Sequence, residues 1–375
     1  MKKRYGIVSY NLYGNFTNYG SALQSFALQT SIDRLDPDKV EAIILDYCPD
    51  VLLDKDALSP MKAMWDTDSE SRKMCEMSLP AIQENYQKFQ RFFHEKFRLS
   101  QGKYISDNFD QSFEQEGLSG YICGSDTLWD IGEFHGFDDG NFANYPVMKQ
   151  NYAVTYAVSC GDAEYEGSDA KTLKERLRNF DAISLREEKY LDFVKENTTG
   201  IEVQSVIDPT LLLTAYDYDQ IAAKRIVEEP YILYYSRRYN PEMEAYVDQL
   251  AQEKHCKVVE ISLRAVNASK HMMYYEAGVE EFLSLVKHSE FVVTNSFHGA
   301  IFGILYQRPF YIFSRERCGT KIFELLKWMG ISDRVVTSAK DAVDKEISYS
   351  EVHQKIANRK ENSIQYLKKV LLHDL

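Results

Sequence analysis

Short apolar runs alternate with amphipathic segments along most of the chain. The first half opens with an apolar run at 4–10, a polar loop, a helical pattern that starts near Ala22, and a second apolar run at 41–47. Apolar runs of this length are typical of buried strands, and apolar residues three or four positions apart are typical of helices that face a core. The order strand, loop, helix, strand predicts a βαβ unit with parallel strands.

The pattern changes over residues of about 50–115. This segment is rich in Met, Lys, Glu and Gln, and its apolar residues recur with the period of a helix, as in YQKFQRFFHEKFRL. Apolar runs typical of strands return only at 121–126 and 151–160. We therefore expect a helical insertion in the first domain.

The alternation of apolar runs and helical patterns starts again after a polar linker at about 215–229. An apolar run at 231–236 precedes a helical pattern in which Asn240 is placed as N-cap and Pro241 as first helical residue. Further strand and helix patterns follow in turn, and the last one is a helical pattern over 350–372. Repeated strand–helix units are typical of parallel sheets that helices cover on both faces.

The predicted fold class is α/β. We expect a Rossmann-like domain over 1–222, a second one over 229–347, and a C-terminal helix within 348–375 that can pack back on the first domain. Two such domains and a terminal helix describe a GT-B-like arrangement. In these folds ligands bind beyond the carboxyl ends of the strands, so polar motifs that directly follow a strand are candidates for chemistry.

The loop after the first strand is one such motif. It ends in Asn18, Tyr19 and Gly20, where the first amides of a helix can hold an anion or a hydroxyl group. The alternative, which the spacing alone favours, is an ordinary helix start capped by Asn18 or Ser21.

A second motif lies at 121–130, YICGSDTLWD. The turn after the strand brings Ser125 and Asp126 to the crevice, and Trp129 is a candidate to stack on a sugar ring. A capped turn beside a Trp in the core explains the same letters equally well.

Arg186 directly follows the apolar run 182–185. A guanidinium group at a strand end that faces a cleft suits a carboxylate or a phosphate. The alternative is a surface salt bridge, since Asp181, Glu187 and Glu188 are close in the sequence.

The segment 291–313 carries the strongest candidate. A strand ends in Thr-Asn-Ser, and Phe297, His298 and Gly299 lead into a helix. Ser296 and the amide of Gly299 would meet an anionic group at the helix start, and His298 could exchange a proton with it. A single His is more often structural, but this one lies at a strand–helix corner beside small residues that let a ligand approach, which favours a functional role.

A cationic cluster follows the next strand. Arg315, Arg317 and Lys321 surround a predicted helix start at Thr320, which makes this segment a candidate anion pocket. An ordinary solvated basic loop is the alternative.

The composition excludes several classes of protein. The net charge is -13, and Lys and Arg form no basic run, so we expect no nucleic-acid partner. The six Cys include no C-x-x-C pair, and no metal-ligand pattern occurs, so we expect reduced thiols and no metal. No apolar run approaches the roughly 20 residues of a membrane span, and no signal peptide is visible. We expect a cytoplasmic protein, with peripheral binding at the inner face of the membrane left open.

Taken together, these motifs resemble those of the polysaccharide pyruvyl transferase family. The likeness spans nearly the whole chain in the expected order. The segments that carry it are NYGSALQSFALQ, GSDTLW, YAVSCG, SLREE, VIDPTLLL, TNSFHGAIFGILYQRPF and GTKIFELLKWMGISDR.

The resemblance implies a GT-B-like enzyme that transfers the enolpyruvyl unit of phosphoenolpyruvate to a sugar and forms a pyruvate ketal, with no further cofactor. His298 and Arg186 match the family's His and Arg motifs, so they are the expected catalytic residues. The expected donor-binding residues are Ser296, Gly299, Arg315, Arg317 and Lys321. The expected acceptor-binding residues are Asn18, Tyr19, Gly20, Ser125, Asp126 and Trp129.

Two other functions fit the same crevice. One is a nucleotide-sugar glycosyltransferase on the same scaffold, and the other is a non-catalytic carbohydrate-binding protein. The sequence does not identify the acceptor, which is a saccharide or a lipid-linked saccharide, and it leaves a homodimer open.

Overall fold

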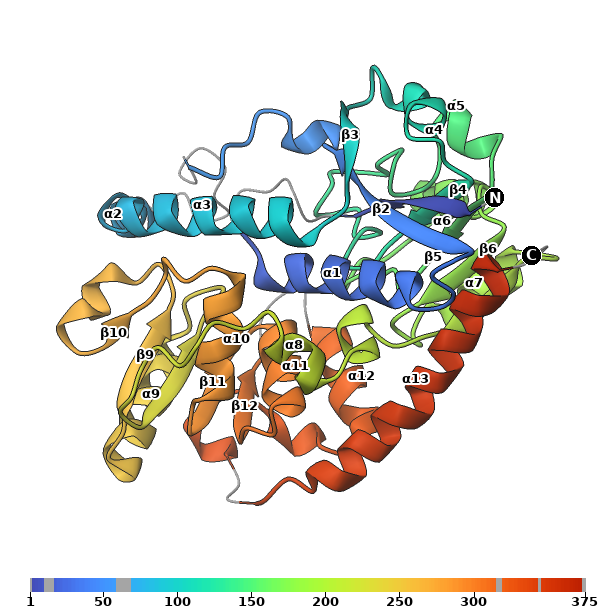
Figure 1. The fold of residues 1–375 in the computed structure, drawn as a ribbon. Helices are drawn as coiled ribbons and strands as arrows, with labels where there is room; N and C mark the ends of the chain where they lie inside the picture. Colours follow the sequence, from blue (N-terminus) through green and yellow to red (C-terminus); the bar gives the residue numbers. More distant parts are fainter. Residues whose placement is uncertain (1, 10–16, 59–68, 315–318, 343–344, 373–375) are drawn as a thin grey trace.

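Two parallel β-sheets organise the chain in the computed structural model (Figure 1). The structure describes residues 2–9, 17–58, 69–314, 319–342 and 345–372. The first sheet has seven strands in the order β3-β2-β1-β4-β5-β6-β7, and the second has six in the order β10-β9-β8-β11-β12-β13. In both sheets the order reverses beside the first strand, which is the topology of doubly wound Rossmann-like sheets.

The first sheet and its helices account for the chain up to residue 219. Its strands are β1 (Lys3–Val8), β2 (Val40–Tyr47), β3 (Leu99–Tyr104), β4 (Gly120–Cys123), β5 (Ala153–Thr155), β6 (Ala182–Leu185) and β7 (Glu202–Ser205). Its helices are α1 (Tyr19–Asp33), α2 (Ser69–Met77), α3 (Leu79–Lys96), α4 (Ser112–Gln115), α5 (Pro146–Lys149), α6 (Gly167–Leu177), α7 (Leu191–Asn197) and α8 (Ala215–Asp219). A 3-10 turn, η4 (Pro209–Leu212), follows β7.

The second sheet and its helices form the other lobe. The strands are β8 (Tyr231–Tyr235), β9 (Lys257–Ile261), β10 (Met272–Met273), β11 (Phe291–Thr294), β12 (Phe310–Phe313) and β13 (Val335–Val336). The helices are α9 (Pro241–Lys254), α10 (Val279–Lys287), α11 (Phe297–Leu305), α12 (Gly319–Met329) and α13 (Tyr349–Leu371).

The segment expected as a helical insertion, 50–115, does contain α2 and α3. It also contains β3, which extends the sheet beyond β2, so α3 belongs to the crossover between two neighbouring parallel strands. The letters of this edge strand, LSQGKY, are mostly polar and only half-buried, so they lack the apolar run by which the inner strands are recognised.

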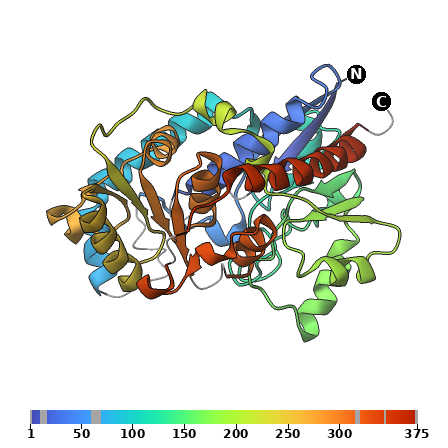
Figure 2. The same cartoon turned by 90° about the horizontal axis from the view of Figure 1, so that it is seen from below.

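The last helix crosses from the second lobe to the first (Figures 1 and 2). Near its start, Lys355 donates a hydrogen bond to the carbonyl of Met329, which ends α12. Near its end, the Tyr366 hydroxyl donates to the carbonyl of Thr155 in β5, and Tyr5 of β1 donates to the carbonyl of Leu371. Helix α13 therefore ties the two lobes together on one side.

An apolar core runs from one lobe into the other. The largest cluster of buried side chains takes members from β1, α1 and α3 and also from β8, α10, α11 and α13. In Figure 1, α1 lies between the first sheet and helices α10 and α11 of the second lobe. Burial of apolar area on both sides of α1 therefore holds the two lobes together.

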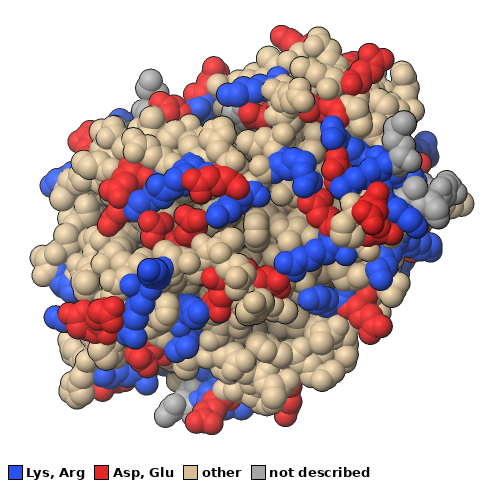
Figure 3. Space-filling view, viewed as in Figure 1, with Lys and Arg blue, Asp and Glu red and all other residues tan. Residues whose placement is uncertain are grey.

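The outer surface mixes both signs of charge. On the face shown in Figure 3, Lys and Arg alternate with Asp and Glu. Among the described residues, no helix combines the length and the apolar character that a membrane span requires.

Candidate active site

The carboxyl ends of β1, β4, β8 and β11 meet between the two lobes. In each sheet these strands stand where the strand order reverses, which is where doubly wound sheets bind ligands. Contact across the interface is direct, since Arg237, just after β8, donates from Nη1 to the carbonyl of Thr17 just before α1 at 3.0 Å. The motifs that follow these strands therefore lie in one crevice.

His298 lies in the first turn of α11 and packs on α1 of the opposite lobe. Ser296 is the N-cap of α11, and its hydroxyl accepts a hydrogen bond from the amide of Gly299 at 3.2 Å. The imidazole is buried, with 7% of the residue exposed. A Cβ atom at Gly20 would lie 2.0 Å from Nδ1 of His298. The imidazole therefore fits only because position 20 carries no side chain.

Arg186 is buried and held by two carboxylates. Its Nη1 lies 2.5 Å from Oδ2 of Asp208, and its Nε lies 3.4 Å from Oε1 of Glu187. The guanidinium carbon stands 4.6 Å from the centre of the Phe297 ring. The alternative placed a salt bridge with Glu187 at the surface, but only 5% of the Arg186 side chain is exposed. Burial of an arginine on this scale is typical of a recognition site rather than of a surface salt bridge.

Asp208 stands between Arg186 and His298. Its Oδ2 lies 3.5 Å from Nε2 of His298, and its Oδ1 accepts hydrogen bonds from the amide and hydroxyl of Thr210 at 2.9 and 2.5 Å. Burial alone would raise the pKa of Asp208, but His298 and Arg186 outweigh burial and hold the pKa well below its usual range. Asp208 is therefore a carboxylate that links the two expected catalytic residues.

Three buried polar atoms in this cluster have no hydrogen-bond partner among the described residues. They are Nη2 of Arg186, Nε2 of His298 and Oε2 of Glu187. Buried polar groups in native proteins are nearly always paired, so three such atoms together indicate that a ligand or water completes the site. Two of the atoms can donate hydrogen bonds and one accepts.

Asp126 and Lys321 belong to the same electrostatic cluster. The carboxylate of Asp126, just after β4, accepts a hydrogen bond from the Ser21 hydroxyl at 2.6 Å. Burial would raise the pKa of Asp126, but Lys321, His298 and Arg186 outweigh burial and lower it. The Lys321 ammonium lies 5.8 Å from the centre of the Phe297 ring. The crevice therefore combines three cationic or protonatable groups with the carboxylates of Asp126 and Asp208.

Three of the expected acceptor-binding residues are occupied elsewhere, so the expectation was wrong for them. Trp129 is fully buried, stacks on Phe142 at 5.1 Å, and donates its indole N–H to the carbonyl of Asn141. Ser125 is fully buried and donates its hydroxyl to the carbonyl of Ala157. Neither offers a free face or hydroxyl to a sugar.

Tyr19 is the third residue of this kind. Its ring stacks on Phe282 of the second lobe with 4.4 Å between centres, and its hydroxyl donates to the carbonyl of Ala277 at 2.6 Å. It therefore belongs to the core between the lobes. Asn18 is the N-cap of α1, as the alternative reading proposed, and its side chain accepts from the amides of Gly20 and Ser21.

The start of α12 is not an open anion pocket. The carboxylate of Asp162, from the loop after β5, accepts hydrogen bonds from the amides of Gly319 and Thr320, both at 3.0 Å. An anion from the first lobe thus already occupies these amides. Lys321 is described and buried, whereas Arg315 and Arg317 lie outside the described residues.

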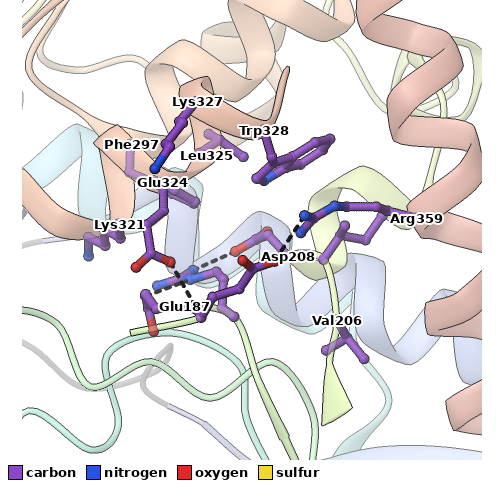
Figure 4. A pocket seen from close by; sticks show the side chains of 13 residues that line it. Glu187, Val206, Asp208, Phe297, Lys321, Glu324, Leu325, Lys327, Trp328 and Arg359 are labelled. Atoms are coloured by element: carbon purple, nitrogen blue, oxygen red, sulfur yellow. Dashed lines mark hydrogen bonds and ion pairs between the residues drawn. The ribbon is translucent and has the colours of Figure 1, made fainter. Parts of the chain in front are cut away.

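A pocket of about 430 Å³ opens beside Arg186 and Asp208 (Figure 4). Helix α12 contributes Glu324 and Trp328 to its wall, and α13 contributes Arg359. The side chains labelled in Figure 4 surround a central space, with Trp328 and Arg359 on the side away from Lys321. The pocket therefore leads from the buried cluster to the surface between α12 and α13.

Several members of the site were not predicted from the sequence. Asp208 entered the sequence analysis only as part of the segment VIDPTLLL, without an expected role, and Glu187 only as a neighbour that could pair with Arg186. Trp328 and Arg359 lie on helices. They do not directly follow a strand, so the position of a residue after a strand could not identify them. Among the described residues, no group of three or more His, Cys, Asp or Glu side chains is placed to hold a metal ion.

Comparison with known families identifies one match. Residues 18–317 match the family described as polysaccharide pyruvyl transferase. The match covers most of the chain and includes α1, Arg186, Asp208 and the His298 motif. Comparison with curated proteins finds no match.

Solved structures with the same fold are distant in sequence. The UDP-GlcNAc 2-epimerase of Neisseria meningitidis, solved bound to UDP-GlcNAc, has a TM-score of 0.51 at 8% identity and covers 99% of this chain and 100% of its own. The UDP-GlcNAc 2-epimerase of Methanocaldococcus jannaschii has a TM-score of 0.51 at 9% identity, with 96% and 92% covered. A glycosyltransferase from Rickettsia africae has a TM-score of 0.50 at 9% identity, with 100% and 99% covered. The predicted GT-B-like fold is confirmed by these neighbours.

Proposed function

Since the chain belongs to the polysaccharide pyruvyl transferase family, we propose that it transfers the enolpyruvyl group of phosphoenolpyruvate to two hydroxyls of a saccharide and forms a pyruvate ketal. The family identifies the chain as a transferase, and the donor and acceptor are our proposal. One observation carries it: Nε2 of His298 and Nη2 of Arg186 are buried without a hydrogen bond, while both side chains form ion pairs with one carboxylate, Asp208.

The proposed reaction needs one proton for carbon and one for phosphate. Protonation of the donor methylene turns it into a methyl group and leaves positive charge on the neighbouring carbon. Two saccharide hydroxyls each form a bond to that carbon, and the bond between that carbon and the phosphate oxygen breaks. One hydroxyl proton replaces the proton delivered to the methyl group, and the other leaves with the phosphate.

His298 is the group that we propose to deliver and recover the first proton. Its Nδ1 side is closed by the backbone at Gly20, so Nε2 is the ring nitrogen left for exchange. Asp208 at 3.5 Å stays ionised and would stabilise the positive charge that forms on the imidazole or on the donor carbon. A group of this kind typically contributes roughly 10²–10⁴-fold to the rate.

Arg186 and Lys321 are the described cations that we propose to hold the donor. Phosphoenolpyruvate carries a carboxylate and a phosphate, and a guanidinium with a free N–H is suited to either. We propose that other residues make the remaining contacts with the donor. They are Ser296 and Gly299 at the start of α11, and Arg315 and Arg317. The carboxylate of Asp126 remains a proposal for contact with an acceptor hydroxyl, beside Asn18 and Gly20.

The test separates chemistry from donor binding. We expect His298→Gln to lower turnover by about 10²–10⁴-fold with little change in the Kd for phosphoenolpyruvate, measured by isothermal titration. Arg186→Lys should instead weaken phosphoenolpyruvate binding, because the ammonium cannot replace the planar fork. Unchanged turnover in the His298 variant would refute its role.

Isothermal titration with nucleotide sugars and with saccharides distinguishes the two alternative functions from pyruvyl transfer. A nucleotide-sugar glycosyltransferase would bind a nucleotide sugar in place of phosphoenolpyruvate. A carbohydrate-binding protein would bind a saccharide and never consume the donor. Because phosphoenolpyruvate is a cytoplasmic metabolite, the proposed reaction takes place in the cytoplasm, with a free or lipid-linked acceptor.

A further inference from the structure

We propose that the pocket between α12 and α13 is the acceptor site, and that Trp328 and Arg359 form its sugar-binding wall. The inference rests on the proposed function, because it takes the cluster of Arg186, Asp208 and His298 as the reacting centre. It replaces the expected acceptor site around Trp129 by one built from the second lobe and the last helix.

The first argument for this assignment is the position of the pocket. The pocket begins at Arg186 and Asp208, so a ligand inside it would touch the buried cluster with one end. The half-buried side chains of Trp328 and Arg359 line the other end, on the side away from Lys321 (Figure 4). A volume of about 430 Å³ lies in the range of small-molecule sites and suits one or two sugar rings. A longer saccharide could continue past the outer wall into solvent.

The charge of the pocket favours a neutral, hydroxyl-rich ligand. Outside the inner cluster, its lining contains two basic side chains and two acidic ones, which are Lys327, Arg359, Glu188 and Glu324. Such a balanced lining gives a small dianion no net attraction. Its hydrogen-bond donors and acceptors can bind saccharide hydroxyls, because a hydroxyl group both donates and accepts. The donor therefore belongs at the inner cluster and the acceptor in the pocket.

The chemistry of the wall is also that of a sugar site. Trp328 is half-buried and packs against the edge of the main apolar core. Glu187, which lines the inner part, is 1% exposed and keeps its Oε2 unpartnered. An aromatic ring with a few fixed polar groups is the usual composition of a small-molecule site, and the indole adds a donor at its edge.

The Arg359 guanidinium lies over the Trp328 indole, from which a ligand can displace it. Its guanidinium carbon lies 4.7 Å from the centre of the Trp328 ring, and its Nη2 lies 2.9 Å from Oε1 of Glu188. The side chains of this ion pair are 34% and 59% exposed. Exposed pairs contribute little to stability, so a saccharide can displace the guanidinium from the ring and use it as a hydrogen-bond donor.

The test measures saccharide and donor binding separately. Free mono- and disaccharides of glucose, galactose, mannose and N-acetylglucosamine are titrated calorimetrically against the full chain, and phosphoenolpyruvate is titrated in parallel. We expect Trp328→Ala to raise the Kd of the best saccharide at least tenfold and to change the Kd of phosphoenolpyruvate less than twofold. Arg359→Ala, at a half-exposed position on α13, should raise the saccharide Kd severalfold.

Phe323→Ala is the matched control. Phe323 is an aromatic residue on the same helix, is 50% exposed, and does not line the pocket. Its removal should leave both Kd values unchanged. Equal saccharide binding by the wild type and by both pocket variants would overturn the inference, as would a wild type that binds none of the saccharides.

The two proposals fail in different ways. If the pocket variants lose saccharide binding but the wild type never consumes phosphoenolpyruvate, the saccharide site stands and pyruvyl transfer is refuted. If the wild type forms product and the pocket variants keep its saccharide Kd and KM, pyruvyl transfer stands and the acceptor lies elsewhere.

Discussion

Replacing Gly20 with Ala should displace the His298 imidazole without changing either group's chemistry. Gly20 lies in the first turn of α1, and His298 lies in the first turn of α11 on the opposite lobe. The added Cβ would lie 2.0 Å from Nδ1, 2.4 Å from Cγ and 2.7 Å from Cε1 of the ring. Because all three contacts are with one rigid ring, either the whole ring must turn away from α1 or the two lobes must move apart.

The size of the effect follows from these distances. Moving Nδ1 from 2.0 Å to the 3.4 Å of an ordinary contact requires a displacement of about 1.4 Å. Misplacement by about 1 Å can cost about 10²-fold in rate, since a reacting group must lie within a narrow range of distances. We therefore expect kcat/KM to fall by about 10²-fold, which corresponds to about 2.7 kcal/mol of transition-state stabilisation.

The assay is steady-state phosphate release from phosphoenolpyruvate in the presence of a saccharide acceptor, with thermal unfolding measured alongside. The folded state should survive, because Ala favours a helix more than Gly does. Gly303→Ala in α11 is the matched control, since its Cβ would meet Phe310 at an ordinary 3.6 Å. A Gly20→Ala protein with wild-type kcat/KM would show that the imidazole position does not matter, and the reasoning would be refuted.

Two further predictions concern stability. Burial alone would lower the pKa of His271, but hydrogen bonds to Glu260 and Asp248 outweigh burial and raise the pKa. The imidazolium therefore stabilises the fold fully below the ordinary His pKa of 6.5, and this stabilisation is lost as the pH rises through the raised pKa. Urea unfolding should show His271→Gln to be destabilised more at about pH 6 than at about pH 9, and an equal loss at both would contradict the charge argument. Asp162→Ala should lower the free energy of unfolding by about 1 kcal/mol, because two amides at the start of α12 lose their acceptor. Asp162→Asn, which keeps one acceptor oxygen, should lose less, and a neutral alanine variant would show that water replaces the carboxylate.

The inner strands could be predicted because each is decided locally. A strand buried on both faces needs a run of apolar residues, and β8, β11 and β12 have such runs. The edge strand β3 does not, because one side of it lacks a neighbour and its residues stay half-exposed. Strands β10 and β13 were not predicted because each has only two residues, too few to form a recognisable apolar run.

The candidate site could be predicted only in part. His298 and Arg186 follow strands at the crevice, and the topology of a parallel sheet brings strand ends to one edge. Trp129 meets the same criterion yet belongs to the core, because Phe142, later in the same connection between β4 and α5, stacks on its ring. Asp208 and Trp328 were overlooked because their roles depend on neighbours from other elements.

The sequence by itself determined the order of strands and helices, the two-lobed fold and the motifs that end at the crevice, because the apolar period is a local property of the chain. Only the tertiary structure decided which groups meet there: the imidazole against Gly20, the carboxylate of Asp208 between His298 and Arg186, and the pocket beneath α13. These contacts join residues far apart in the chain. They depend on how the two lobes pack against each other. That packing is decided by side-chain volumes and buried charges from distant parts of the chain, which a local sequence pattern does not contain.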